Sequence, residues 1–168
     1  MLPQLAILKI QLKKGRDGPS TLVCIRPDGS RTWSKVHPFF PVHDLTHYAV
    51  ESVLGFTQAF FGLLASGWNI DDFSRPLAAR QQGSEALFAE MIVGIFDLER
   101  ANRGIFGEVE FNAALAESLS GQGMPPFRFL SEDELRSVRT LRGDLVSRWW
   151  SVPEGESLEI DFPAMVGA

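Results

Sequence analysis

Residues 38–68, PFFPVHDLTHYAVESVLGFTQAFFGLLASGW, decide the fold of this chain. From Val53 to Ala65 the side chains are apolar in nearly every direction, and a helix of that kind is either buried or crosses a membrane. The apolar run is shorter and more interrupted than the about 20 residues that a membrane span needs. Pro41 suits the first turn of a helix, where its missing N–H makes no difference. The stretch therefore predicts one long, buried helix against which the other elements pack.

Segments typical of β-strands lie on both sides of this helix. Residues 5–36 contain three such segments, separated by turns with glycine and proline, and they predict an antiparallel meander. Residues 157–162 (SLEIDF) alternate between polar and apolar side chains, as a last strand. The outward Glu159 and Asp161 of this strand would complement the outward lysines of the first strand. We therefore expect the last strand to pair with the first.

Three further helices are expected after the long one. Residues 84–103 carry a regular apolar face, and residues 108–119 carry a weaker helical pattern. Ser131 and Glu134 match a capping box at the start of the last helix. The order of three strands, four helices and one strand favours an α+β fold, in which an antiparallel sheet packs on about four helices. Nothing in the chain suggests a second domain, so residues 1–168 are expected to form one.

The composition is that of an ordinary soluble protein, with 45% hydrophobic and 22% charged residues. A net charge of −5 argues against nucleic acid as a general partner. The N-terminus lacks the basic and apolar regions of a signal peptide, and no membrane partner is expected. Cys24 is the only cysteine, which excludes an internal disulfide and a zinc site built on several thiolates. A cytoplasmic location fits these features.

The histidines of the chain are clustered. His37, His43 and His47 are the only three, and they fall within eleven residues. His43 and His47 are one helical turn apart on one face, and two imidazoles at that spacing can bind one divalent metal ion. Histidines near the start of a helix also act as caps or form hydrogen bonds in the core. The cluster alone leaves both interpretations open.

Acidic residues extend the candidate site. We expect Glu51, one turn beyond His47, to be the third ligand, and His37 or Glu90 to complete the shell. Glu90 is an acid within an apolar segment, where it either faces solvent or points to a partner such as this site. Imidazole and carboxylate ligands suit zinc or a similar divalent ion. Asp44 or Glu51 would then accept a proton from a water molecule that the metal polarises.

Residues 43–47, HDLTH, resemble two short zinc-binding motifs. They are similar to the HExxH motif of zinc peptidases, with Asp44 at the position of the glutamate that acts as general base there. They are also similar to the HDxxH motif of the coenzyme Q biosynthesis protein 4 family, whose additional glutamate corresponds to Ala59 here. Both resemblances imply zinc bound by His43 and His47. Each covers five residues, and neither assigns the chain to a family.

Two functions of different classes follow from these features. The first is a small metal-dependent enzyme with hydrolase-like chemistry, or a metal carrier, whose substrate the sequence does not indicate. The second is a non-catalytic structural or interaction module that forms a homodimer through the Phe-rich helix. The interface would then consist of Phe56, Phe60 and Phe61 together with Gly55 and Gly62.

Overall fold

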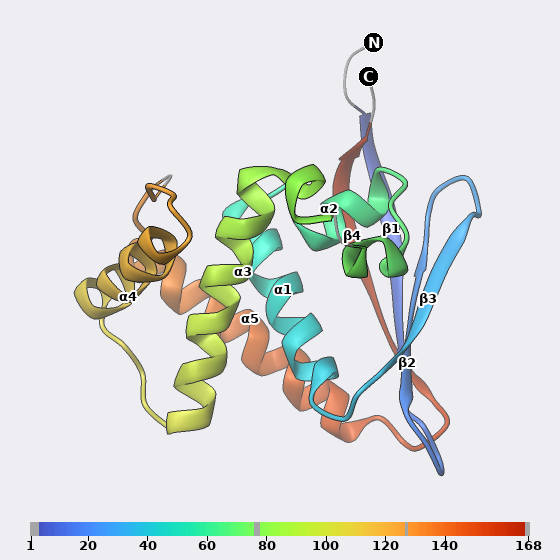
Figure 1. The fold of residues 1–168 in the computed structure, drawn as a ribbon. Helices are drawn as coiled ribbons and strands as arrows, with labels where there is room; N and C mark the ends of the chain where they lie inside the picture. The colour runs from blue at the N-terminus through green and yellow to red at the C-terminus, as the bar shows by residue number, and fades with distance from the viewer. Residues whose placement is uncertain (1–3, 76–77, 127, 167–168) are drawn as a thin grey trace.

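A four-stranded antiparallel sheet and a layer of helices on one of its faces make up the computed structural model in Figure 1. The structure describes residues 4–75, 78–126 and 128–166. The sheet lies on the right of Figure 1, and α4 on the left lies farthest from it. The elements in chain order are β1 (Gln4–Lys13), β2 (Ser20–Ile25), β3 (Arg31–Val36), α1 (Phe40–Leu54), α2 (Phe60–Ala65), the 3₁₀ helix η1 (Ile70–Ser74), α3 (Ala78–Asn102), α4 (Glu108–Gly121), α5 (Glu132–Ser151) and β4 (Ser157–Val166).

The sheet has the strand order β3-β2-β1-β4, so the last strand pairs with the first as expected. Lys9 lies opposite Asp161, and the side chain of Gln11 donates a hydrogen bond to Glu159 over 2.9 Å. The predicted α+β fold, with an N-terminal meander completed by a C-terminal strand, is confirmed. The face of the sheet that meets the helices is apolar because the strands alternate. It carries the buried residues Leu8, Ile10, Leu12, Leu22, Cys24, Leu158, Ile160 and Phe162.

The prediction of one long central helix is wrong. The helix α1 ends at Leu54, because Gly55 takes a left-handed conformation with φ 71° that a helix cannot continue through. The chain resumes as the separate short helix α2 only at Phe60. The apolar pattern across this stretch is therefore shared by two helices and the loop between them.

Two carboxylates, one buried and one partly exposed, hold the loop between α1 and α2. Glu85 of α3 accepts hydrogen bonds from the backbone N–H groups of Thr57 and Gln58, and Glu51 of α1 accepts those of the first residues of α2. These carboxylates satisfy donors that the start of a short helix leaves without partners. Gly62 packs closely against the loop, and a Cβ there would lie 2.1 Å from the carbonyl oxygen of Thr57. The break is therefore specified by contacts from residues distant in sequence.

The Phe-rich segment is covered within the chain. Phe61 packs beneath the sheet, and Phe56 packs in a second core among α1, α3, α4 and α5. Their exposed fractions are only 1% and 8%. The surface expected for a homodimer is therefore wrong, because its central side chains already serve the folding of one chain. Self-association itself stays a prediction.

The other predicted helices are found close to their expected ends. Within α3, Gly83 has φ 82° and ψ 178°, so the regular part of this helix begins at Ser84. The side chains of Ser131 and Glu134 form the expected capping box at the start of α5. In the part of the chain that the structure describes, no helix is long and apolar enough to cross a membrane.

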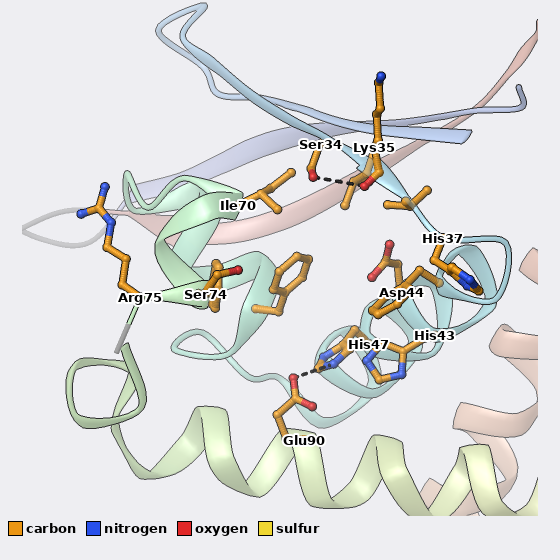
Figure 2. A pocket seen from close by; sticks show the side chains of 15 residues that line it. Ser34, Lys35, His37, His43, Asp44, His47, Ile70, Ser74, Arg75 and Glu90 are labelled. Carbon is orange, nitrogen blue, oxygen red and sulfur yellow. Dashed lines mark hydrogen bonds and ion pairs between the residues drawn. The ribbon is translucent and has the colours of Figure 1, made fainter. Parts of the chain in front are cut away.

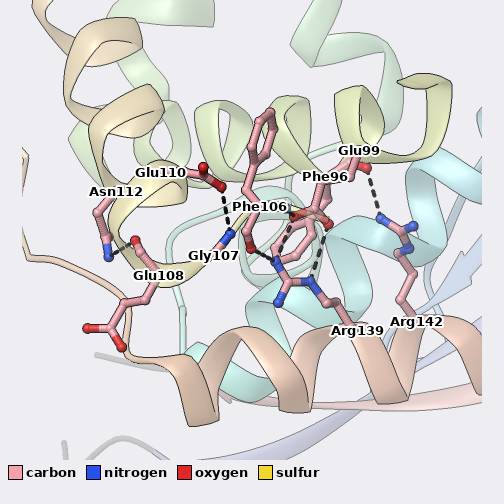
Figure 3. Close-up of polar contacts among 9 residues, drawn as sticks. All are labelled: Phe96, Glu99, Phe106, Gly107, Glu108, Glu110, Asn112, Arg139 and Arg142. Carbon is pink, nitrogen blue, oxygen red and sulfur yellow. Dashed lines mark hydrogen bonds and ion pairs between the residues drawn. The ribbon is translucent and has the colours of Figure 1, made fainter. Parts of the chain in front are cut away.

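A buried ion pair fastens α5 to α3, as Figure 3 shows. Arg139 contacts Glu99 over 2.6 Å and also donates to the carbonyl oxygen of Phe106. Arg142 donates to the carbonyl oxygen of Phe96, and both guanidinium groups lie 5.8 Å from the Phe96 ring centroid. Because α1 packs between α3 and the sheet, these contacts also fix the face of α3 that the histidines of α1 meet.

Candidate metal centre

The helix α1 directs His43 and His47 toward Glu90 of α3 (Figure 2). His47 Nε2 lies 3.0 Å from Glu90 Oε1, and the two imidazole centroids are 4.9 Å apart. One ligand atom from each of the three residues lies within 4.8 Å of those of the other two. These three residues, called the metal group below, could hold one metal ion.

A carboxylate holds the other nitrogen of each imidazole ring. His43 Nδ1 lies 2.7 Å from Asp97 Oδ2, and His47 Nδ1 lies 3.3 Å from Glu51 Oε1. This leaves Nε2 of each ring for a metal ion. Histidine ligands in metal sites commonly donate their second N–H to a carboxylate, which fixes the orientation and tautomer of the ring.

Asp97 was not among the residues that the sequence suggested. It lies seven residues beyond Glu90, which places both carboxylates on one face of α3, two turns apart. That spacing was visible in the sequence. What the sequence lacked was any sign that this face of α3 meets the histidines of α1.

Glu51 lies behind His47 rather than beside the metal group. Its side chain is fully buried, and its second oxygen accepts the backbone N–H groups of Phe61 and Gly62. It is therefore placed to position His47, whereas the third residue of the metal group is Glu90. Glu51 is two turns from His43, roughly 12 Å away along the helix axis, so these two side chains do not easily reach one ion. A side chain from a neighbouring helix reaches that position more easily.

The remaining two predicted residues, His37 and Asp44, line a cavity beside the metal group without belonging to that group. His37 is exposed in the loop before α1, where its ring stacks on Phe39 with centroids 5.5 Å apart. Asp44 is buried, and its Oδ2 has no hydrogen-bond partner among the described residues. In Figure 2 its carboxylate points toward β3, away from Glu90.

The electrostatics of the site favour a positive charge between Glu51 and Glu90, either on His47 itself or on a metal ion bound to it. Burial lowers the pKa of His47, but the hydrogen bonds that its ring donates to Glu51 and Glu90 outweigh burial and raise this pKa to about 10. Burial also raises the pKa of Asp44 to about 7, although the nearby His47 and His43 oppose that effect. Without a metal ion, His47 is therefore an imidazolium between two carboxylates, and a metal ion has to displace its proton.

No family model, curated protein or solved structure matches the chain. The resemblance of residues 43–47 to two zinc motifs is therefore not extended by a match over the rest of the sequence. Any function has to be argued from the geometry of the site.

The metal group forms part of the wall of a cavity of about 680 Å³. The side chain of His43 is 29% exposed and that of Glu90 46% exposed, whereas His47 is almost completely buried. Small molecules can therefore approach the metal group from one side. Three protein ligands with one accessible side are typical of catalytic metal sites, where a fourth position is left for water or substrate.

Proposed function

We propose that this chain binds one divalent metal ion, zinc or an ion with similar ligand preferences, through His43, His47 and Glu90. The observation that carries the proposal is the pair of carboxylates, Asp97 and Glu51, that hold the Nδ1 atoms of the two imidazoles. Two histidines that only filled space in a core would not need a carboxylate on each Nδ1 atom, with both Nε2 atoms directed toward the same point. Nitrogen and carboxylate ligands without thiolates suit zinc and similar divalent ions.

We further propose that the bound ion serves a hydrolase-like reaction in the cavity. A divalent ion at this position would supply Lewis acidity and lower the pKa of a water molecule. Asp44 lines the same cavity, and its unpartnered Oδ2, which points toward β3 and away from Glu90, would accept the proton of that water through a second water molecule.

The alternative is a non-catalytic module in which His47 acts only as an ion-pair partner. Its raised pKa and its contacts with Glu51 and Glu90 favour this alternative, because a proton alone then satisfies all three groups. The cluster would fasten α1 to α3 without binding metal. This alternative no longer includes a dimer through the Phe-rich segment, since Phe56 and Phe61 are buried.

Metal content and titration of the untagged protein separate the two functions. We expect one equivalent of zinc per chain for the native protein and for His37→Ala, because His37 lies outside the metal group. His47→Ala and Glu90→Gln should lose stoichiometric zinc. A native protein that takes up no zinc, or a Glu90→Gln variant with unchanged affinity, would contradict the proposed site.

A further inference from the structure

The cavity beside the metal group has an aromatic wall, made of Phe40 of α1, Phe60 of α2 and Phe73 of η1. The centroids of Phe60 and Phe73 lie 4.8 Å apart. Those of His47 and Phe60 lie 5.6 Å apart, and those of Phe40 and His43 lie 5.8 Å apart. The aromatic wall therefore borders the metal group directly.

Packing of the core does not account for these rings completely. Phe61 is buried in the core, whereas its neighbour Phe60 is only half-buried. Phe73 is half-buried as well, and Phe40 is 51% exposed. Phe60 and Phe73 pack on the core beneath the sheet and at the same time line the cavity. They leave apolar ring surface for a ligand.

The sheet and η1 add aliphatic surface to the same cavity. Leu22 of β2, Val36 of β3 and Ile70 of η1 line it together with the aromatic wall, and we call this lining the apolar slot. Figure 2 shows Ile70 between β3 and the metal group. The volume of about 680 Å³ lies within the range of about 300–1,000 Å³ that is usual for small-molecule sites. A flat ring gains both apolar burial and aromatic contacts in such a slot.

Asp44 gives an independent indication of a ligand. The residue is only 7% exposed, and its Oδ2 has no partner among the described residues. Figure 2 shows its carboxylate directed toward Ser34 and Lys35 across the cavity. Buried carboxylate oxygens ordinarily accept hydrogen bonds, so this atom calls for an N–H or O–H group of a ligand.

The charges around the cavity do not call for a charged ligand in its interior. Asp44 and Glu90 are the acidic groups of its lining, whereas the cationic Lys35 and Arg75 are exposed at the rim. The guanidinium of Arg75 already pairs with Asp72 over 2.8 Å. Without a metal ion, the imidazolium of His47 offsets the charge of Glu90, so an uncharged molecule suits the interior. An amide fits best, because it offers an N–H to Asp44 and a carbonyl oxygen to the metal group.

We propose that the substrate is a small, uncharged aromatic amide, with its ring in the apolar slot and its N–H donated to Asp44. This inference rests on the proposed function. In hydrolysis the oxygen of water bonds to the carbonyl carbon, and the C–N bond breaks. Asp44 takes the proton of the water and returns it to the nitrogen, which leaves as an amine. The products are a carboxylic acid and an amine, and no further reactant is needed.

Ligand binding to the metal-free protein tests this inference separately from metal binding. Saturation-transfer NMR should detect benzamide with a dissociation constant on the order of 1 mM, a usual strength for so small a ligand. Acetamide, which lacks the ring, and N,N-dimethylbenzamide, which lacks the N–H, should bind several times more weakly. Phe73→Leu should weaken benzamide about fivefold, and Ile70→Trp should fill the slot and abolish binding. The control Phe129→Leu changes an exposed ring outside this cavity and should leave binding unchanged.

Zinc titration of the same samples distinguishes failure of the aromatic-amide inference from failure of the proposed metal site. Benzamide that binds no better than acetamide, or binds equally well to Ile70→Trp, overturns the aromatic amide whether or not zinc is taken up. Slot-dependent binding of benzamide in a protein that takes up no zinc overturns the proposed metal site but supports the apolar slot. If neither Phe73→Leu nor Ile70→Trp folds, the comparison of benzamide with acetamide and N,N-dimethylbenzamide on the native protein decides, because it needs no substitution.

Discussion

Replacing Asp97 by asparagine should weaken zinc binding about tenfold. Asp97 Oδ2 lies 2.7 Å from His43 Nδ1, and the substitution keeps a hydrogen-bond acceptor there but removes the negative charge. Loss of a carboxylate behind a histidine ligand typically lowers metal affinity about 10- to 100-fold, or about 1.4–2.7 kcal/mol. The side chains of Asp97 and His43 are 25% and 29% exposed, so solvent reduces the effect. We therefore expect a value near the lower end of this range.

Glu51→Gln should have a larger effect through the same kind of contact. The Glu51 side chain is fully buried beside His47, and water cannot replace its charge. We expect about a hundredfold loss of zinc affinity. The variant should also lose about 1 kcal/mol of stability, because the carboxylate accepts the backbone N–H groups at the start of α2.

Competition with a chromophoric chelator at fixed pH measures these affinities. Glu85→Gln is the matched control, since Glu85 also accepts backbone N–H groups of the loop between α1 and α2 but lies outside the contacts of the histidines. It should lower the melting temperature and leave zinc affinity unchanged. If Asp97→Asn binds zinc as tightly as the native protein, or if Glu85→Gln loses as much affinity as Glu51→Gln, then the carboxylates on the Nδ1 atoms do not strengthen zinc binding.

Three further predictions concern stability and assembly. With chelator present, the free energy of unfolding should fall as the pH rises from about 3.8 to about 7, because folded Asp44 holds its proton more tightly than the unfolded chain does. Denaturant titrations should then find Asp44→Asn more stable than the native protein at pH 8, by up to about 4 kcal/mol. At pH 4 the two proteins should be equally stable. Saturating zinc should raise the melting temperature of the native protein and of Asp44→Asn but not of His47→Ala, as calorimetry can measure, and equal shifts in all three would place the ion elsewhere. Sedimentation at micromolar concentration should detect a dimer, and a single species of 18.7 kDa at all concentrations would disprove self-association.

Local sequence signals predicted most of the fold. The alternation in residues 157–162 determined which face of β4 is buried, and pairing with β1 followed from the complementary charges of Lys9 and Asp161. The capping box of Ser131 and Glu134 is likewise formed by residues that are neighbours in sequence. The capping box needs no distant contact, and the pairing of β4 with β1 was predictable because each strand shows its buried face and its charges in its own sequence.

The break between α1 and α2 could not be read from the same kind of signal. Gly55 and Gly62 were visible, but apolar residues continue on both sides of them. What interrupts the helix is the capture of the loop by Glu51 and Glu85, and Glu85 lies on a different helix. The apolar pattern reports burial, and it does not say whether one helix or two are buried.

The sequence predicted only the part of the candidate site that lies on a single helix. The spacing of His43 and His47 is a property of one helix and is found as expected. The grouping of Glu90, rather than Glu51, with the two histidines depends on how α3 packs on α1, as does the contact of Asp97 with His43. Helix periodicity specifies the faces of each helix but leaves open which faces meet.

Anomalous diffraction from crystals grown with zinc tests whether His43, His47 and Glu90 bind one divalent ion. Data collected on both sides of the zinc absorption edge locate the ion without assumptions about its ligands. We expect one ion per chain, bound by Nε2 of His43, Nε2 of His47 and the carboxylate of Glu90, with Asp97 and Glu51 still on the Nδ1 atoms. Absence of an ion from this position, with His47 still paired to both Glu51 and Glu90, would contradict it.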